Sequence, residues 1–110
     1  MIMKENDSNE KIANVIKTLE EIIDIVKNNE TDLAWSRFNT IDELIDELLD
    51  HIKKLINRDF SKLDNLNLLF APTASLQEIS ISSGWASRFL VISEKFDNAI
   101  EELKKELHTS

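Results

Sequence analysis

Only one glycine, Gly84, and one proline, Pro72, occur in the 110 residues of this chain. A β-sandwich or barrel needs turn residues about every 8–12 positions, and Gly and Pro supply many of these turns. The chain lacks the turn residues of an all-β fold, whereas long helices need few of them. We therefore expect a mostly helical protein in which Pro72 and Gly84 mark corners of the chain.

Apolar residues recur at the spacing of an amphipathic helix in three long stretches. The first stretch predicts a helix over 9–28. For the second, we favour one helix over 32–57, and the alternative is a short helix over 32–38 that bends into another over 41–57. The third stretch predicts a helix over 85–107.

Shorter helices are expected between the second and third stretches. Three leucines on one face predict a helix that begins at Ser61 and ends at Ala71, because the residue before proline disfavours the α conformation. A second short helix is predicted over 76–83, before Gly84. The alternative for residues 79–82 is a strand, since Ile and Ser alternate there.

Two sequences have the form of a capping box, in which a Ser or Thr hydroxyl accepts a hydrogen bond from the backbone of a Glu three residues later. One runs from Thr40 to Glu43, and the other from Ser75 to Glu78. The second predicts the start of the short helix over 76–83. The first supports the alternative with a helix over 41–57, but cap residues also occur inside helices, so the single helix over 32–57 remains favoured.

None of these helices can bury its apolar stripe alone. The predicted fold is therefore an all-α antiparallel helical bundle of three long amphipathic helices plus one or two short helices. Residues 1–8 are polar and aperiodic, so we expect a flexible N-terminal tail followed by a single domain over 9–110. The centres of the stripes predict the buried core: Ile16, Leu19, Ile23, Ile45, Leu48, Ile52, Phe89, Ile92 and Phe96.

Five acidic residues occur within nine positions of the second stretch: Asp42, Glu43, Asp46, Glu47 and Asp50. Like charges four residues apart destabilise a helix slightly. Runs of charge usually form a solvated face, and this is the first interpretation. The second is an anionic patch that binds a basic partner, with these five residues as candidate contacts.

No metal, cofactor or catalytic site is expected. Neither His51 nor His108 belongs to the Glu-x-x-His motif of di-iron bundles, and the acids lack the spacing of an EF-hand. We interpret His51 as a surface histidine paired with Glu47. The chain has no cysteine, no Gly-x-Ser-x-Gly elbow and too few glycines for a phosphate loop, so we expect a protein that is not an enzyme.

The charge and hydropathy of the chain favour another protein as its partner. The formal net charge is -8, which opposes binding to the phosphates of nucleic acid. No apolar run approaches the length of a membrane span, and the N-terminal residues lack the apolar core of a signal peptide. Together with the absence of cysteine, these features predict a cytoplasmic protein.

The stretch over 65–93 contains only two charged residues, Glu78 and Arg88. Binding surfaces are depleted in charge and enriched in aromatic residues, so Phe70 and Trp85 are further candidate partner contacts. The competing interpretation is that the other helices cover this stretch. In either case we expect it to be folded, because disordered segments are usually charged and poor in large apolar residues.

In length, net charge and helical content the chain resembles the bacterial immunity proteins that neutralise basic nuclease toxins, a similarity of class without a shared motif. The expected function is that of a non-catalytic acidic protein that binds another protein. Its most concrete form is an inhibitor or immunity-type protein that masks a basic site. The alternatives are a self-associating structural or regulatory module, such as a homodimer, and a bundle with a small-molecule pocket near Trp85 and Phe70.

Overall fold

The computed structural model describes residues 2–33, 36–71 and 74–108, with side chains from Ser8 onward. These ranges contain no strand and five helices: α1 (Ile2–Asn28), α2 (Ile41–Ile56), α3 (Leu63–Leu69), α4 (Ser75–Ser83) and α5 (Ala86–His108). The all-helical prediction is confirmed. The expected corner at Pro72 lies outside the described residues.

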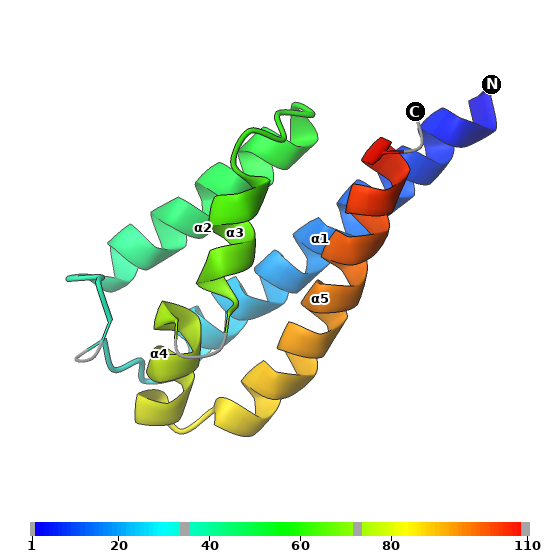
Figure 1. Ribbon diagram of the computed structural model, residues 1–110. Coiled ribbons are helices and arrows are strands. Elements are labelled where there is room, and N and C mark those ends of the chain that lie inside the picture. The colour runs from blue at the N-terminus through cyan, green and yellow to red at the C-terminus, as the bar shows by residue number, and fades with distance from the viewer. Residues whose placement is uncertain (1, 34–35, 72–73, 109–110) are drawn as a thin grey trace.

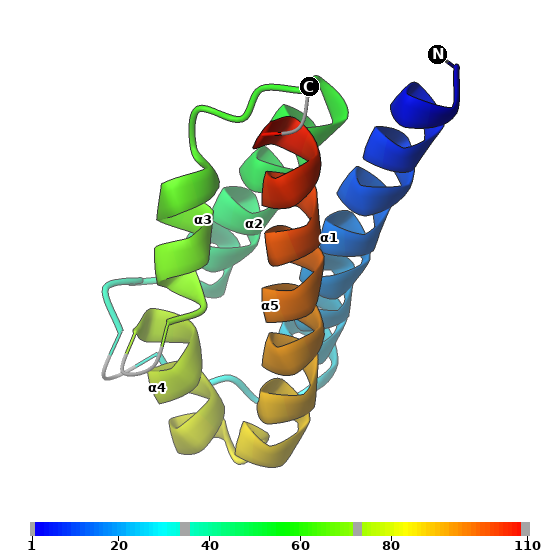
Figure 2. The same cartoon turned by 45° about the vertical axis from the view of Figure 1, so that its right-hand side comes forward.

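The longest helix, α1, packs along α5 and also contacts α2. α1 and α5 run in opposite directions, so both ends of the chain lie at the same end of the molecule (Figure 1). The short helices α3 and α4 follow one another along one side, and α4 packs against the first turns of α5 (Figure 2). The result is an elongated molecule of 48 × 23 × 22 Å.

α1 begins at Ile2, seven residues before its predicted start. Residues 2–8, where we expected a flexible tail, instead form the first turns of this helix. The segment contains neither glycine nor proline, so nothing in the backbone stops the helix from extending beyond its apolar stripe.

The favoured helix over 32–57 is wrong, because α2 begins only at Ile41. Residues 32–33 and 36–40 are not helical, so the short helix of the alternative is absent there too. Trp35, which we included in that helix, lies outside the described residues. The capping box decides where α2 starts.

The Oγ1 atom of Thr40 accepts a hydrogen bond from the Glu43 amide at 3.1 Å. In return, the Glu43 carboxylate accepts one from the Asn39 amide at 3.0 Å. Two amide groups at the start of α2 therefore have side-chain partners, and Thr40 itself has the extended backbone of an N-cap residue. The Thr40 cap and the alternative helix start at Ile41 are confirmed, whereas the Glu43 carboxylate binds the amide one residue before the cap and not that of Thr40 itself.

The second predicted capping box is wrong. The N-cap of α4 is Ala74, which makes no capping hydrogen bond through its side chain, and Ser75 is already the first helical residue. The helix itself agrees with the prediction over 76–83, and the alternative strand over 79–82 is wrong.

α4 ends at Gly84, as predicted. Gly84 has a φ of 84°, a left-handed conformation that glycine adopts without steric cost. Its amide donates to the Ile81 carbonyl at 3.3 Å, and the Trp85 amide donates to the Ser80 carbonyl at 2.9 Å. This pair of hydrogen bonds is a Schellman motif, which reverses the chain between α4 and α5.

Aromatic residues join the short helices to α5. Phe70, directly after α3, stacks on Phe96 with ring centroids 3.8 Å apart and lies 6.1 Å from Phe89. Trp85 packs edge-on against Phe89 at 6.5 Å. All four rings are buried, so the described parts of the stretch over 65–93 contribute to the folded core, as expected.

Six of the nine predicted core residues are buried, and Ile16, Ile45 and Ile52 are only partly buried. In α2 the buried residues are instead Leu44, Leu48, His51 and Leu55. The apolar residues of α2 cover a broad arc of its surface. The neighbouring helices bury the edge of that arc that contains Leu48 and His51. Ile45 and Ile52 lie at the other edge and are only partly buried.

Candidate functional site

His51 is the least expected member of the core. Its side chain is 7% exposed, between Leu48 and Leu55 on the buried face of α2, so the predicted surface histidine paired with Glu47 is wrong. Burial lowers the pKa of the imidazole below its usual 6.5, although the nearby carboxylates of Glu47 and Asp50 act in the opposite direction. Near neutral pH the ring is therefore uncharged, with one N–H donor and one nitrogen acceptor.

Within the part of the chain that the structure describes, neither ring nitrogen of His51 makes a hydrogen bond. The ring instead lines a cleft of about 620 Å³, which we call the His51 cleft. Its walls come from α2, α3, the start of α4 and the segment before α2. The lining residues are Arg37, Glu47, Asp50, His51, Lys62, Asn65, Leu68, Leu69, Ala74, Ser75 and Glu78.

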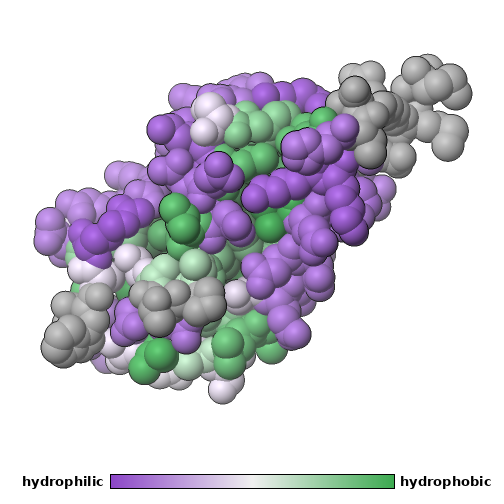
Figure 3. Space-filling model, viewed as in Figure 1, coloured by the Kyte–Doolittle hydropathy of each residue, from purple (hydrophilic) through white to green (hydrophobic). Residues whose placement is uncertain are grey.

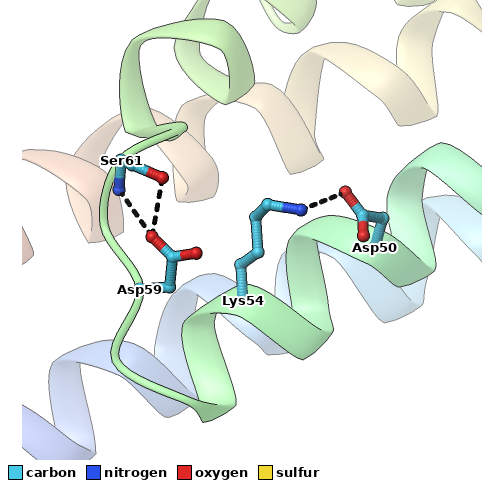
Figure 4. Close-up of polar contacts among 4 residues, drawn as sticks. All are labelled: Asp50, Lys54, Asp59 and Ser61. Atoms are coloured by element: carbon cyan, nitrogen blue, oxygen red, sulfur yellow. Dashed lines mark hydrogen bonds and ion pairs between the residues drawn. The ribbon is translucent and has the colours of Figure 1, made fainter.

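Two of the acids that line the cleft are held by ion pairs. The Glu47 carboxylate binds the Arg37 guanidinium, which also lies 4.3 Å from the centre of the Phe38 ring. The Asp50 carboxylate accepts a hydrogen bond from Lys54 Nζ at 2.6 Å, one turn along α2 (Figure 4). Lys54 thereby lowers the pKa of Asp50.

The connection from α2 to α3 borders the same region. There the Asp59 carboxylate accepts hydrogen bonds from the Ser61 amide at 3.1 Å and from the Ser61 hydroxyl at 2.6 Å (Figure 4). These hydrogen bonds lower the pKa of Asp59. They also fix the turn that places Lys62 at the rim of the cleft.

The structure gives the five predicted acids of α2 different roles. Glu43 caps the helix, Glu47 is partly buried against Arg37, and Asp50 is exposed but paired with Lys54. Asp42 and Asp46 are exposed and make no hydrogen bond or ion pair with any residue described. The first two turns of α2 therefore present two unpaired carboxylates, at positions one and two turns before Asp50, which lines the His51 cleft.

Phe70 and Trp85, the other predicted contacts, are both 3% exposed. Their rings serve the core, which agrees with the interpretation that other helices cover this stretch. The Trp85 Nε1 atom is buried without a hydrogen-bond acceptor among the described residues. Phe70 lines a groove of about 430 Å³ between α3, α4 and α5, and Trp85 is not among the residues that line it.

Sequence reasoning placed Glu47 and Asp50 at a candidate site but missed the cleft beside them. Leu44, Leu48, His51 and Leu55 follow a 4-3-4 spacing, which is a signal for a common helix face. The same spacing occurs in Ile45, Leu49, Ile52 and Ile56, and the sequence gives no reason to prefer the first set. The contributions of Arg37, Lys62 and Glu78 depend on how separate segments pack, and no local pattern indicates them.

The lining of the His51 cleft can be compared with the groups that catalysis, metal binding and ligand binding need. No hydrogen bond links His51 to a carboxylate or hydroxyl among the described residues. In the same residues, no three His, Asp or Glu side chains come together in a way that could hold a metal ion. The cleft does combine hydrogen-bonding groups, charges of both signs and apolar side chains, which is typical of ligand sites.

Apolar side chains also reach the surface between the helices, among a larger hydrophilic area (Figure 3). None of the helices described is both long enough and apolar enough to span a membrane. Comparisons with models of protein families, with curated proteins and with solved structures give no significant match.

Proposed function

We propose that this protein is a non-catalytic binding protein that recognises a basic partner protein through the acidic residues of α2 and the adjoining His51 cleft. The observation that carries the proposal is the pair of unpaired carboxylates, Asp42 and Asp46, on the same helix as Glu47 and Asp50, which line the His51 cleft together with Glu78. The net charge of -8 adds a negative potential over the whole molecule.

These charges act mainly on the rate of association. Exposed ion pairs each contribute about 0–1 kcal/mol, so Asp42 and Asp46 alone provide little affinity. A surface of one sign nevertheless steers an oppositely charged partner and raises the association rate at low salt. The affinity then has to come from contacts in the more enclosed His51 cleft.

The most concrete form of this proposal is an inhibitor or immunity-type protein that masks the basic site of its target in the cytoplasm. We further propose that α1, α2 and α5 form an antiparallel bundle of three long helices. The contacts of α1 with both α2 and α5 support this arrangement. In such a bundle the acids of α2 are held by the core rather than by a mobile loop.

The test uses a peptide rich in Arg and Lys, with association rates measured at about 50 and about 200 mM salt. In the variant Asp42→Asn with Asp46→Asn, we expect slower association and a weaker dependence on salt. The matched control is Glu20→Gln with Asp24→Asn, which removes two exposed charges at the same spacing from α1. Equal effects of the two variants would show that only net charge matters, and the proposed surface would be rejected.

The self-associating module is a second candidate, favoured by exposed apolar residues on α2. Leu49 is 48% exposed and Ile56 is 65% exposed, and both lie on one helix face with the partly buried Ile45 and Ile52. If two copies paired through this face in antiparallel orientation, Asp46 of one copy would lie beside Lys53 of the other.

Light scattering over a range of protein concentrations measures this association directly. We expect Asp46→Lys and Lys53→Asp to weaken the dimer when introduced singly, and the combined exchange to restore it. A mass that stays monomeric up to about 1 mM would reject this candidate, because a specific contact of this kind should be populated at that concentration.

A further inference from the structure

Three side chains that line the His51 cleft are available to a ligand. His51 is nine-tenths buried without a hydrogen-bond partner in the part of the chain described. Glu78, in the first turn of α4, is partly buried and makes no ion pair with any described residue. Leu68 lines the cleft although it is 66% exposed. A ligand that suits all three would combine hydrogen-bond donors, positive charge and an apolar stem.

Of these three side chains, the neutral imidazole of His51 provides one hydrogen-bond acceptor through its unprotonated ring nitrogen. The ring nitrogens of His51 are not among the fully buried atoms that lack a partner, so they reach the solvent through the cleft, and a ligand that donates a hydrogen bond to the acceptor nitrogen takes the place of water there. The carboxylate of Glu78 adds a second acceptor, and it is charged. Hydrogen bonds between charged groups are about twice as strong as those between neutral ones.

The remaining charges of the cleft leave room for a cation. Arg37 is neutralised by Glu47, and Asp50 by Lys54. Lys62 is the lining cation without an ion pair among the described residues, but it is exposed and its charge is screened by solvent. Glu78 is the lining carboxylate without an ion pair among the described residues, it is less exposed than Lys62, and the whole molecule is negative.

We infer that the His51 cleft receives an arginine side chain of the partner, with the guanidinium donating to Glu78 and His51 and the aliphatic stem covering Leu68. This inference rests on the proposed function for the basic character of the partner. An arginine suits the cleft better than a lysine because its planar guanidinium has five donors and is more weakly hydrated. Its aliphatic stem packs on apolar surface while its charged end binds polar groups.

The test is a titration with N-acetyl-arginine methylamide, followed by the NMR signals of the His51 ring protons and the Leu68 methyl groups. We expect saturable shifts of both sets of signals. The control ligand is the citrulline analogue, which has nearly the same shape but no charge, and it should cause no saturable shift. The lysine analogue should bind more weakly than the arginine one.

The variant Glu78→Gln should weaken arginine binding about tenfold, as expected for the loss of one charge-assisted hydrogen bond. Its matched control is Glu10→Gln, which removes one exposed charge from α1 and should leave the binding constant unchanged. Both substitutions lie outside the buried core, so both variants should fold.

Three results would overturn the inference: no saturable shift with the arginine ligand, equal binding of the citrulline or lysine analogue, or equal effects of Glu78→Gln and Glu10→Gln. The outcome is separate from the test of the proposed function. If Asp42 and Asp46 control peptide binding while the arginine ligand leaves the cleft signals unchanged, the proposed function stands and the arginine site fails. If the arginine ligand binds the cleft but removing Asp42 and Asp46 leaves peptide binding unchanged, the arginine site stands and the proposed function fails.

Discussion

Replacing Leu48 by alanine tests the orientation of α2, on which the His51 cleft depends. Leu48 is 0% exposed, whereas its neighbour Leu49 on the same helix is 48% exposed. Truncation of a fully buried leucine loses its transfer free energy and leaves a cavity, at a total cost of about 2.7–5 kcal/mol. About half of Leu49 is already in water, so the same truncation there should cost roughly 1 kcal/mol.

The two variants are compared by urea unfolding, followed by far-ultraviolet circular dichroism. We expect Leu48→Ala to lower the free energy of unfolding by about 3 kcal/mol. With an unfolding slope of about 1–3 kcal/mol per molar urea, the midpoints of the two variants should differ by about 1 M. The orientation of α2 would be wrong if Leu49→Ala cost as much as Leu48→Ala, or if Leu48→Ala kept the midpoint of the original protein.

Three further predictions concern the helix ends and the buried histidine. Thr40→Ala removes the hydrogen-bond acceptor of the Glu43 amide and should lower the free energy of unfolding by about 1 kcal/mol in the same assay. An unchanged free energy of unfolding would show that the Thr40 cap does not determine where α2 starts. Gly84→Ala should cost about 1–2 kcal/mol through its backbone conformation alone, because a Cβ there meets no atom within 4 Å, and Gly84→Asn should cost less. Burial lowers the pKa of His51 in the folded state, so the unfolded state takes up its proton first as the pH falls below 6.5. Stability should therefore decrease with falling pH below that value, and His51→Gln should reduce this dependence; equal pH profiles of the two proteins would contradict the burial of the ring.

The two helices that agree best with the sequence are those with the strongest local signals. α5 starts one residue after its predicted start, and its last residue is one beyond the predicted end. The end of α4 is fixed by Gly84, the one residue whose backbone suits a left-handed cap without strain. Helical periodicity and backbone chemistry act within a few residues, so the sequence alone carries them.

The errors occur where local signals compete. An apolar pattern continues through Leu33 and Phe38, and it suggested a helix before Ile41. The structure places Phe38 in the core from a non-helical segment, and Thr40 caps the helix that follows. Ser75 has the form of a cap, yet Ala74 occupies that position. A capping sequence identifies where a helix can start, and the packing of the surrounding chain decides whether it does.

The sequence by itself determined that this protein is helical, where most of its helices end, and that its net charge is negative. Only the tertiary structure decided which edge of the apolar arc of α2 is buried, and hence that His51 belongs to the core. The physical reason is that a helix with a wide apolar arc can turn about its own axis and still bury apolar area. The packing of α2 against α1 removes that freedom, and in the resulting arrangement His51, Glu78 and Leu68 line one cleft.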